Sequence, residues 1–121
     1  MWRFQVPGYI SEFQYYGNTS QEFTEIALPA GTDPAGYTVQ IYMFDGSVFD
    51  AFPLGTSSGT MGGYDVYVID ASTPGFDDGG VDPTGNLYPD DALALVNSSG
   101  TVEPFVSYWG STVTATEGPA A

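Results

Sequence analysis

The fold is decided by the stretch Tyr37-Thr38-Val39-Gln40-Ile41-Tyr42-Met43-Phe44, which is followed by Asp45-Gly46 and by a second run over residues 47–52. Residues two apart share one face of a β-strand, and both runs alternate with that period. An Asp-Gly pair between two such runs is a strong hairpin signal, because both turn residues need positive φ. We therefore predict two antiparallel strands joined by a tight turn.

The rest of the chain repeats this pattern of short apolar runs between turn clusters. With 16 Gly, 9 Pro and 16% aromatic residues in 121, the composition favours β structure over helix. Further strands are expected at residues 9–16, 23–28, 64–69, 92–96, 101–109 and, as a last short one, 112–116. Residues 97–100 form a second hairpin loop, and Pro104 marks an edge strand or a bulge. We predict an all-β antiparallel β-sandwich over residues 9–121, preceded by an N-terminal arm over residues 1–8.

Residues 72–91 differ from the rest because they are rich in turn formers and carboxylates and poor in core formers. We predict a long acidic surface loop, with one helical turn near residues 89–92. Calcium takes six to eight oxygen ligands from carboxylates, amides and carbonyls on a turning backbone. The candidate ligands are Asp77, Asp78, Asp82, Asn86, Asp90 and Asp91. Their spacing matches neither the EF-hand nor the nonapeptide calcium repeat, and the alternative is a solvated loop in which Asp and Gly form turns.

The composition excludes several kinds of chemistry. The chain has no Cys, His or Lys, so thiolate, imidazole and Schiff-base catalysis and Cys- or His-ligated zinc are absent. A carboxylate-only glycosidase would need two acids about 5–9 Å apart. The candidate pairs are Glu12 with Glu25 and Asp65 with Asp70, but charged residues on edge strands are more often a defence against aggregation. We expect that the protein is not an enzyme.

The net charge points to the class of partner. Arg3 is the single basic residue against fifteen acidic ones, for a formal charge of −14. Such a surface repels phosphate and anionic lipid, so we expect no direct nucleic-acid binding and no membrane insertion. It attracts cations, free or carried by a basic protein partner. The simpler alternative is that the charge only keeps the domain soluble.

Exposed aromatic residues are candidates for an interface. Two large aromatics in a terminal arm are unusual unless they dock, and rows of Tyr and Trp can anchor a protein partner or stack on sugars. The interface candidates are Trp2, Phe4, Tyr15, Tyr16 and Trp109. The alternative is that both faces of the strands are covered by the domain itself.

Five segments in a fixed order also carry a resemblance to a known family. Near the start these are Ile10-Ser11-Glu12-Phe13, Glu22-Phe23-Thr24-Glu25-Ile26 and Asp33-Pro34-Ala35-Gly36-Tyr37-Thr38-Val39. Residues 91–110 and 114–121 follow in the second half. Together they resemble the lamin-tail-type domains of the bacterial branch, which occur in secreted nucleases and Hint-domain proteins. The resemblance implies an immunoglobulin-like β-sandwich with a non-catalytic accessory role.

Two departures from that family bear on the interpretation. Tyr37 stands where many relatives carry Trp, which exchanges one core aromatic for another. The chain also stops at Ala121, where bacterial relatives continue into a further strand. A fragment, a processed product and a subunit that borrows a strand from a neighbour are all consistent with this ending.

Two functions follow as hypotheses. The first is a non-catalytic binding module of a secreted or surface protein, stabilised by calcium. The second is a structural subunit of a virion, surface assembly or filament, which self-assembles by pairing edge strands and the N-terminal arm with neighbours. Both place the protein outside the cell, on its surface or on a virion, although the chain shows no signal peptide.

Overall fold

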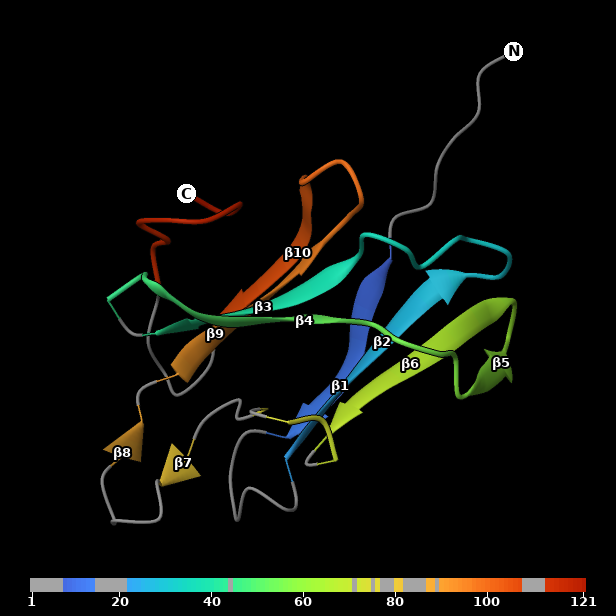
Figure 1. The fold of residues 1–121 in the computed structure, drawn as a ribbon, viewed down its shortest axis with the longest axis horizontal. Coiled ribbons are helices and arrows are strands. Elements are labelled where there is room, and N and C mark those ends of the chain that lie inside the picture. The colour runs from blue at the N-terminus through green and yellow to red at the C-terminus, as the bar shows by residue number, and fades with distance from the viewer. Residues whose placement is uncertain are drawn as a thin grey trace.

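The computed structural model describes residues 8–14, 22–43, 45–70, 72–74, 76, 80–81, 87–88, 90–107 and 113–121, with the backbone alone at 80–81, 87–88 and 90–91. Eight antiparallel strands form two four-stranded sheets, and the described residues contain no helix (Figure 1). The predicted β-sandwich is therefore confirmed. Its finer assignment as immunoglobulin-like stays a prediction.

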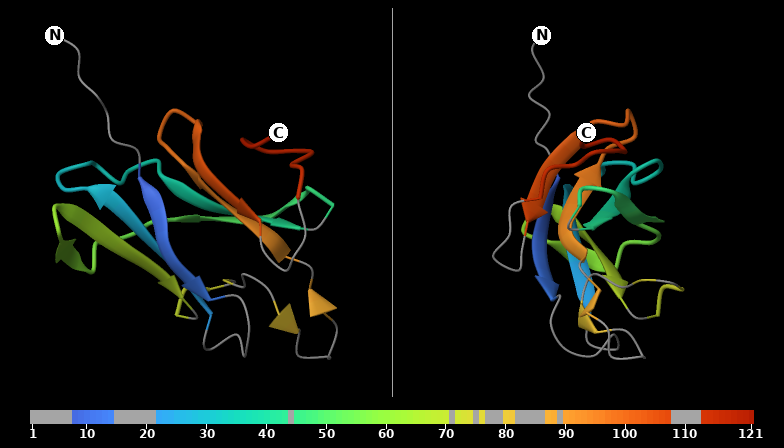
Figure 2. Two further views of the ribbon diagram at one scale, coloured as in Figure 1. Left: turned by 180° about the vertical axis from the view of Figure 1, so that it is seen from behind. Right: turned by 90° about the vertical axis from the view of Figure 1, so that its left-hand side faces the viewer.

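Each of the two sheets contains four strands. Sheet A has the order β1 (Tyr9–Gln14), β2 (Phe23–Pro29), β6 (Tyr64–Asp70), β5 (Gly59–Met61). Sheet B has the order β10 (Val102–Ser107), β9 (Asp90–Val96), β3 (Thr38–Met43), β4 (Val48–Pro53). The edge strands β1 and β10 contact each other, and the chain passes from β4 to β5 at the opposite side (Figures 1 and 2).

Both hairpins of sheet B close in the same way. The Met43 amide donates to the Ser47 carbonyl at 2.8 Å, and the Asn97 amide donates to the Thr101 carbonyl at 2.9 Å. Three residues separate each pair, and the last of them is a glycine at positive φ, 87° at Gly46 and 81° at Gly100. This is the geometry of a three-residue hairpin loop with glycine in the left-handed region. Both predicted hairpins are confirmed, but the first is closed by residues 44–46 rather than by the two-residue Asp-Gly turn that the sequence predicts.

The main core lies between the sheets. Alternate residues of each central strand point inward, because side chains two apart share a face. Ile26 and Leu28 from sheet A and Val39, Ile41 and Leu93 from sheet B are all fully buried. The remaining buried members are Tyr37, Phe52, Leu54, Tyr67, Ile69, Phe76 and Leu95. Burial of these apolar side chains on both inner faces holds the sandwich together.

A second apolar cluster lies on the outer face of sheet B. Tyr42, Ala92, Ala94 and Val96 point away from the main core, yet each is at most 3% exposed. Residues 113–121, here called the C-terminal strap, run across this face and cover it (Figure 2). The central strands of sheet B are therefore buried on both sides.

Polar contacts fix the strap at both ends. The Val113 amide donates to Ser107 Oγ at 3.2 Å, and the Thr116 amide donates to the Gly46 carbonyl at 2.9 Å. The Ala120 amide donates to the Tyr42 hydroxyl at 3.1 Å. Glycine is required at position 46, because a Cβ there would collide with the Thr114 carbonyl. The Asp45-Gly46 turn is therefore also the place where the C-terminal strap contacts the β3–β4 hairpin.

Four expectations need correction. The 72–91 region is not without structure, because β7 (Gly80–Val81) pairs with β8 (Leu87–Tyr88) inside it. The helical turn predicted near residues 89–92 is wrong, since β9 already begins at Asp90 and pairs with Met43 of β3. The short strand at 112–116 is wrong over its described part, because residues 113–116 form no strand; Val113 bonds instead to the Ser107 side chain and Thr116 to the Gly46 carbonyl. The strand β5 was not predicted, because its sequence Gly-Thr-Met lacks any apolar alternation.

Candidate functional site

Most of the sequence-predicted site residues lie outside the described part of the chain. This applies to Asp77, Asp78, Asp82 and Asn86 of the calcium set and to the whole interface set: Trp2, Phe4, Tyr15, Tyr16 and Trp109. Asp90 and Asp91 lie in β9, with only their backbone described. The side chains that are described hold no cluster of three metal-ligating groups, and no described helix is long and apolar enough to cross a membrane. The calcium site stays a prediction.

The structure brings one of the two candidate carboxylate pairs together and keeps the other apart. Glu12 and Glu25 are direct cross-strand partners in β1 and β2, so the register brings them together. Asp65 and Asp70 are five positions apart on β6, about 16 Å along a strand, and the odd spacing puts them on opposite faces. Each of this second pair has a local structural role instead. Asp65 accepts hydrogen bonds from Thr60 and Gly31, and Asp70 accepts two from Ser72.

A β-bulge positions the glutamate pair. The β1–β2 register shifts between Ile10 and Glu12, so Ser11 is the extra residue. The Ser11 hydroxyl donates to Glu25 Oε1 at 2.8 Å and lies 3.2 Å from the Glu25 carbonyl oxygen. The bulge thus orients the Glu25 carboxylate and places Glu12 directly opposite it.

These glutamates lie on the outer face of sheet A, which carries a concentration of exposed apolar side chains. Among the described residues, the large hydrophobic side chains that are exposed are Tyr9 at 42%, Met61 at 70% and Val68 at 40%. All three point away from the core. Tyr9 pairs with Ala27, Val68 pairs with Glu25 and Met61 pairs with Tyr64, whereas the core-facing positions of β2 are Ile26 and Leu28.

The register arranges this face in two neighbouring cross-strand rows. One row runs Tyr9–Ala27–Val66, and the other runs Glu12–Glu25–Val68. The Tyr9 and Tyr64 rings make an edge contact, with ring centroids 5.3 Å apart. The face therefore presents an aromatic and aliphatic area directly beside a pair of carboxylates. We call this surface, made of Tyr9, Glu12, Glu25, Tyr64, Val66, Val68 and Met61, the sheet A face.

A second polar site joins the two sheets where β1 meets β10. Glu103 Oε2 accepts from the Gly8 amide at 2.7 Å, and Oε1 accepts from the Tyr37 hydroxyl at 3.3 Å. Burial, and then the nearby Glu103 charge, raise the pKa of Tyr37 above its ordinary value of 10.0. Tyr37 is only 5% exposed, so this is a structural clamp and not a surface open to a ligand.

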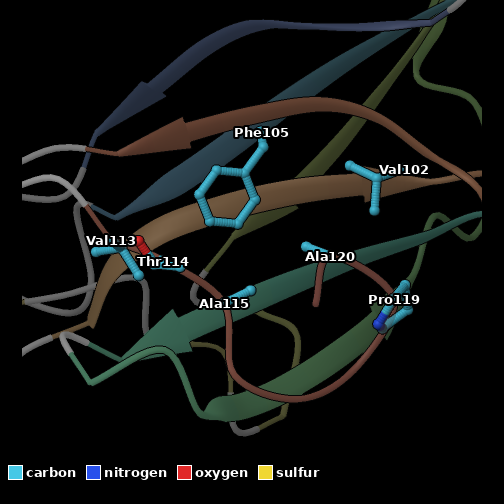
Figure 3. Close-up of a pocket in the computed structure, with 7 residues that line it drawn as sticks. All are labelled: Val102, Phe105, Val113, Thr114, Ala115, Pro119 and Ala120. Carbon is cyan, nitrogen blue, oxygen red and sulfur yellow. The ribbon is translucent and has the colours of Figure 1, made fainter.

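The strap leaves a shallow hollow against β10 (Figure 3). It has a volume of about 360 Å³ and is lined by Val102, Phe105, Val113, Thr114, Ala115, Pro119 and Ala120. The Phe105 ring makes an edge contact with Tyr42, with ring centroids 5.5 Å apart. Among the described lining residues there is no charged side chain and no hydroxyl except that of Thr114. It therefore offers no catalytic group and little to orient a polar ligand.

Comparison with protein-family models, curated proteins and solved structures finds no match to this chain. Its function is therefore argued from the residues and contacts described above.

Proposed function

We propose that this chain is a non-catalytic binding module that holds a protein partner against the sheet A face. The observation that carries the proposal is the position of Tyr9, Met61 and Val68, which share one face of one sheet. Single exposed apolar residues need no explanation, but a contiguous group of them marks an interaction surface. Aromatic and Met side chains are also enriched at the centres of protein interfaces.

The edges of the two sheets support binding through a face rather than by strand addition. β10 carries Pro104 and a register shift, β1 carries the bulge at Ser11, and β5 is only three residues long. On β4, the Val48 amide donates to Glu117 and the Ala51 amide donates to Asp50. Prolines, bulges, short edges and occupied donors all limit edge-to-edge pairing. The alternative of a subunit that assembles through its edge strands is therefore less favoured.

The non-catalytic part of the proposal follows from composition and position. No His, Cys or Lys is present to move a proton or act as a nucleophile at neutral pH. Glu12 and Glu25 are cross-strand partners on the outer face of sheet A, and Glu12 is exposed to solvent. The motif order that resembles bacterial lamin-tail-type domains supports an accessory role in a secreted or surface protein, with calcium at the 72–91 region as a further part of the proposal.

The experiment is site-specific photocrosslinking in cells that produce this chain, followed by binding measurements with the purified partner. A photoreactive residue replaces Met61 or Val68 and, as a control, the exposed Ser99 or Thr114 away from the face. We expect one protein to crosslink at 61 and 68 and not at the control positions. The purified partner should then bind the wild-type chain and bind the Met61→Ser/Val68→Ser variant several-fold more weakly by calorimetry. Equal crosslinking at all positions, or equal affinity for both chains, would overturn the proposal.

A further inference from the structure

We propose that the partner of the sheet A face is a cationic amphipathic polypeptide, with Lys or Arg side chains next to apolar ones. This inference rests on the proposed function and specifies its partner. It is carried by the juxtaposition of the Glu12–Glu25 pair with the exposed Val68 in one cross-strand row.

The glutamate pair is unfavourable in the free domain. Directly opposed residues on adjacent antiparallel strands have Cβ atoms about 4.5–5.5 Å apart, and like charges at that separation destabilise a sheet. The described residues contain no basic side chain that could offset this repulsion, and the Ser11 hydroxyl is the neutral donor that Glu25 has there. A cation supplied by a partner converts the repulsion into two attractions. The binding energy therefore includes the relief of a penalty that the free domain carries.

Apolar contacts around the glutamates select a polypeptide over a free cation. Val68 is the partner of Glu25 in β6, and Tyr9 lies one row away, about 7 Å along the strands, with its ring against that of Tyr64. A Lys or Arg between the glutamates would bring an apolar side chain two residues away, which shares its face of an extended chain, onto Val68. The same cation lies within reach of the tyrosine rings, whose faces attract positive charge.

Charge complementarity also excludes the other occupants of such a face. A second copy of this chain would bring another fifteen acidic residues and only one basic residue, a net charge of −14. Nucleic acid and anionic lipid carry the same sign as the sheet A face and are repelled. A basic protein segment is the macromolecule that satisfies both the carboxylates and the apolar side chains.

The test uses three synthetic peptides of about ten residues, a length that spans four strands of a sheet. All three carry Ser at every second position, because residues two apart share a face of an extended chain. The other positions carry Lys and Leu in turn in one peptide, Lys and Ser in turn in the second, and Glu and Leu in turn in the third. Binding to the full chain is measured by fluorescence anisotropy at low and at high salt. We expect the Lys–Leu peptide to bind most tightly, the Lys–Ser peptide to bind weakly and the Glu–Leu peptide not to bind.

Two matched variants locate the interaction. Glu12→Gln/Glu25→Gln removes two charges from the sheet A face, and Asp45→Asn/Asp50→Asn removes two charges from sheet B while retaining the Oδ1 acceptors used there. We expect the first variant to bind the Lys–Leu peptide roughly threefold to tenfold more weakly and the second to bind nearly as the wild type does. The first variant should also have the higher melting temperature, because its like-charge repulsion is gone. A loss of binding therefore cannot come from unfolding.

The outcomes separate this inference from the proposed function. Equal weakening in both charge variants, or equal binding of the Lys–Leu and Lys–Ser peptides, would show attraction to the net charge alone and would overturn the inference. If Met61→Ser/Val68→Ser weakens peptide binding and Glu12→Gln/Glu25→Gln does not, the binding face stands and the cationic partner is wrong. If neither variant changes the binding of any peptide, both proposals fail at this face.

Discussion

The outer faces of both sheets carry apolar side chains, but those on sheet B are covered and several on sheet A are exposed. On sheet B, Tyr42, Ala94 and Val96 are covered by the C-terminal strap and are at most 3% exposed. On sheet A, Tyr9 and Val68 occupy the corresponding outward positions and are about two-fifths exposed. The strap accounts for the difference, because it supplies Val113, Ala115 and Ala120 to one face and nothing to the other. An apolar outer face is therefore either packed by the chain itself or left open for a partner.

The largest expected effect comes from truncating the covered face. Tyr42→Ala should destabilise the fold by about 3–5 kcal/mol, because it removes a fully buried ring that packs against the strap and Phe105. Val68→Ala on the open face should cost less than about 1 kcal/mol. Guanidinium unfolding of the two variants measures both changes. Similar values would mean that the faces do not differ in packing.

The next effect tests the strap itself. Gly46→Ala should destabilise the protein by about 2 kcal/mol or more, because the new Cβ collides with the Thr114 carbonyl and adds strain at a φ of 87°. Gly55→Ala is the control, since Gly55 has a φ of 74° and open space around it. Gly55→Ala should lower the free energy of unfolding only through backbone strain, by about 1 kcal/mol. Amide hydrogen exchange should show earlier opening of residues 113–121 in the Gly46 variant and not in the Gly55 variant.

A smaller effect is expected at Glu103, which joins the two sheets by accepting hydrogen bonds from Gly8 and Tyr37. Tyr37→Phe should destabilise the fold by about 1 kcal/mol below pH 10.0, because its hydrogen bond to Glu103 is lost. The pKa of Tyr37 is raised in the folded state, so its contribution is complete below the ordinary value and is lost as the pH rises through the folded value. The difference in free energy of unfolding between the wild type and Tyr37→Phe should therefore decrease as the pH rises above 10.0. A gap that widens with pH would contradict this assignment.

The smallest effect concerns one Asp-x-Ser turn on each sheet. Hydrogen bonds from Ser72 lower the pKa of Asp70 below 3.8, and those from Ser47 do the same for Asp45. Ser72→Ala and Ser47→Ala should each raise the pKa of the neighbouring carboxyl in an NMR titration. A lowered pKa stabilises the fold above the unfolded value and is lost as the pH falls through the folded one. Because both carboxyls are solvent-exposed, stability should change little, and a large loss in either variant would reveal a contact beyond the turn.

The local patterns in the sequence were sufficient for most strands of the two sheets and for both hairpins of sheet B. Alternation over residues 37–52 identified β3 and β4, the small polar loop at 97–100 identified the β9–β10 hairpin, and Pro104 identified an edge with a bulge. Each of these signals depends on near neighbours in the chain, which is why it can be read without a structure. The strand β5 carried no such signal, because its position depends on pairing with β6 and not on its own residues.

The sequence predicted only part of the sheet A face. The sequence singled out Glu12 and Glu25 as a possible pair, but it gave no register, and a shift of one residue would have turned one of them to the core. It did not single out Tyr9, Met61 or Val68, because β6 is apolar on both faces and alternation alone cannot say which face is covered. The described residues neither support nor oppose the candidates at Trp2, Phe4, Tyr15, Tyr16 and Trp109, which lie outside them.

The sequence alone determined that this protein is a β-sandwich with an anionic surface and without histidine, cysteine or lysine chemistry, because composition and periodicity are properties of the chain itself. Only the tertiary structure decided which of two apolar outer faces is closed. That choice depends on contacts between residues 113–121 and strands more than 60 positions away, such as the Ala120–Tyr42 hydrogen bond with a separation of 78. No local pattern records such a contact, because it forms only when the sheets have already brought its two ends together.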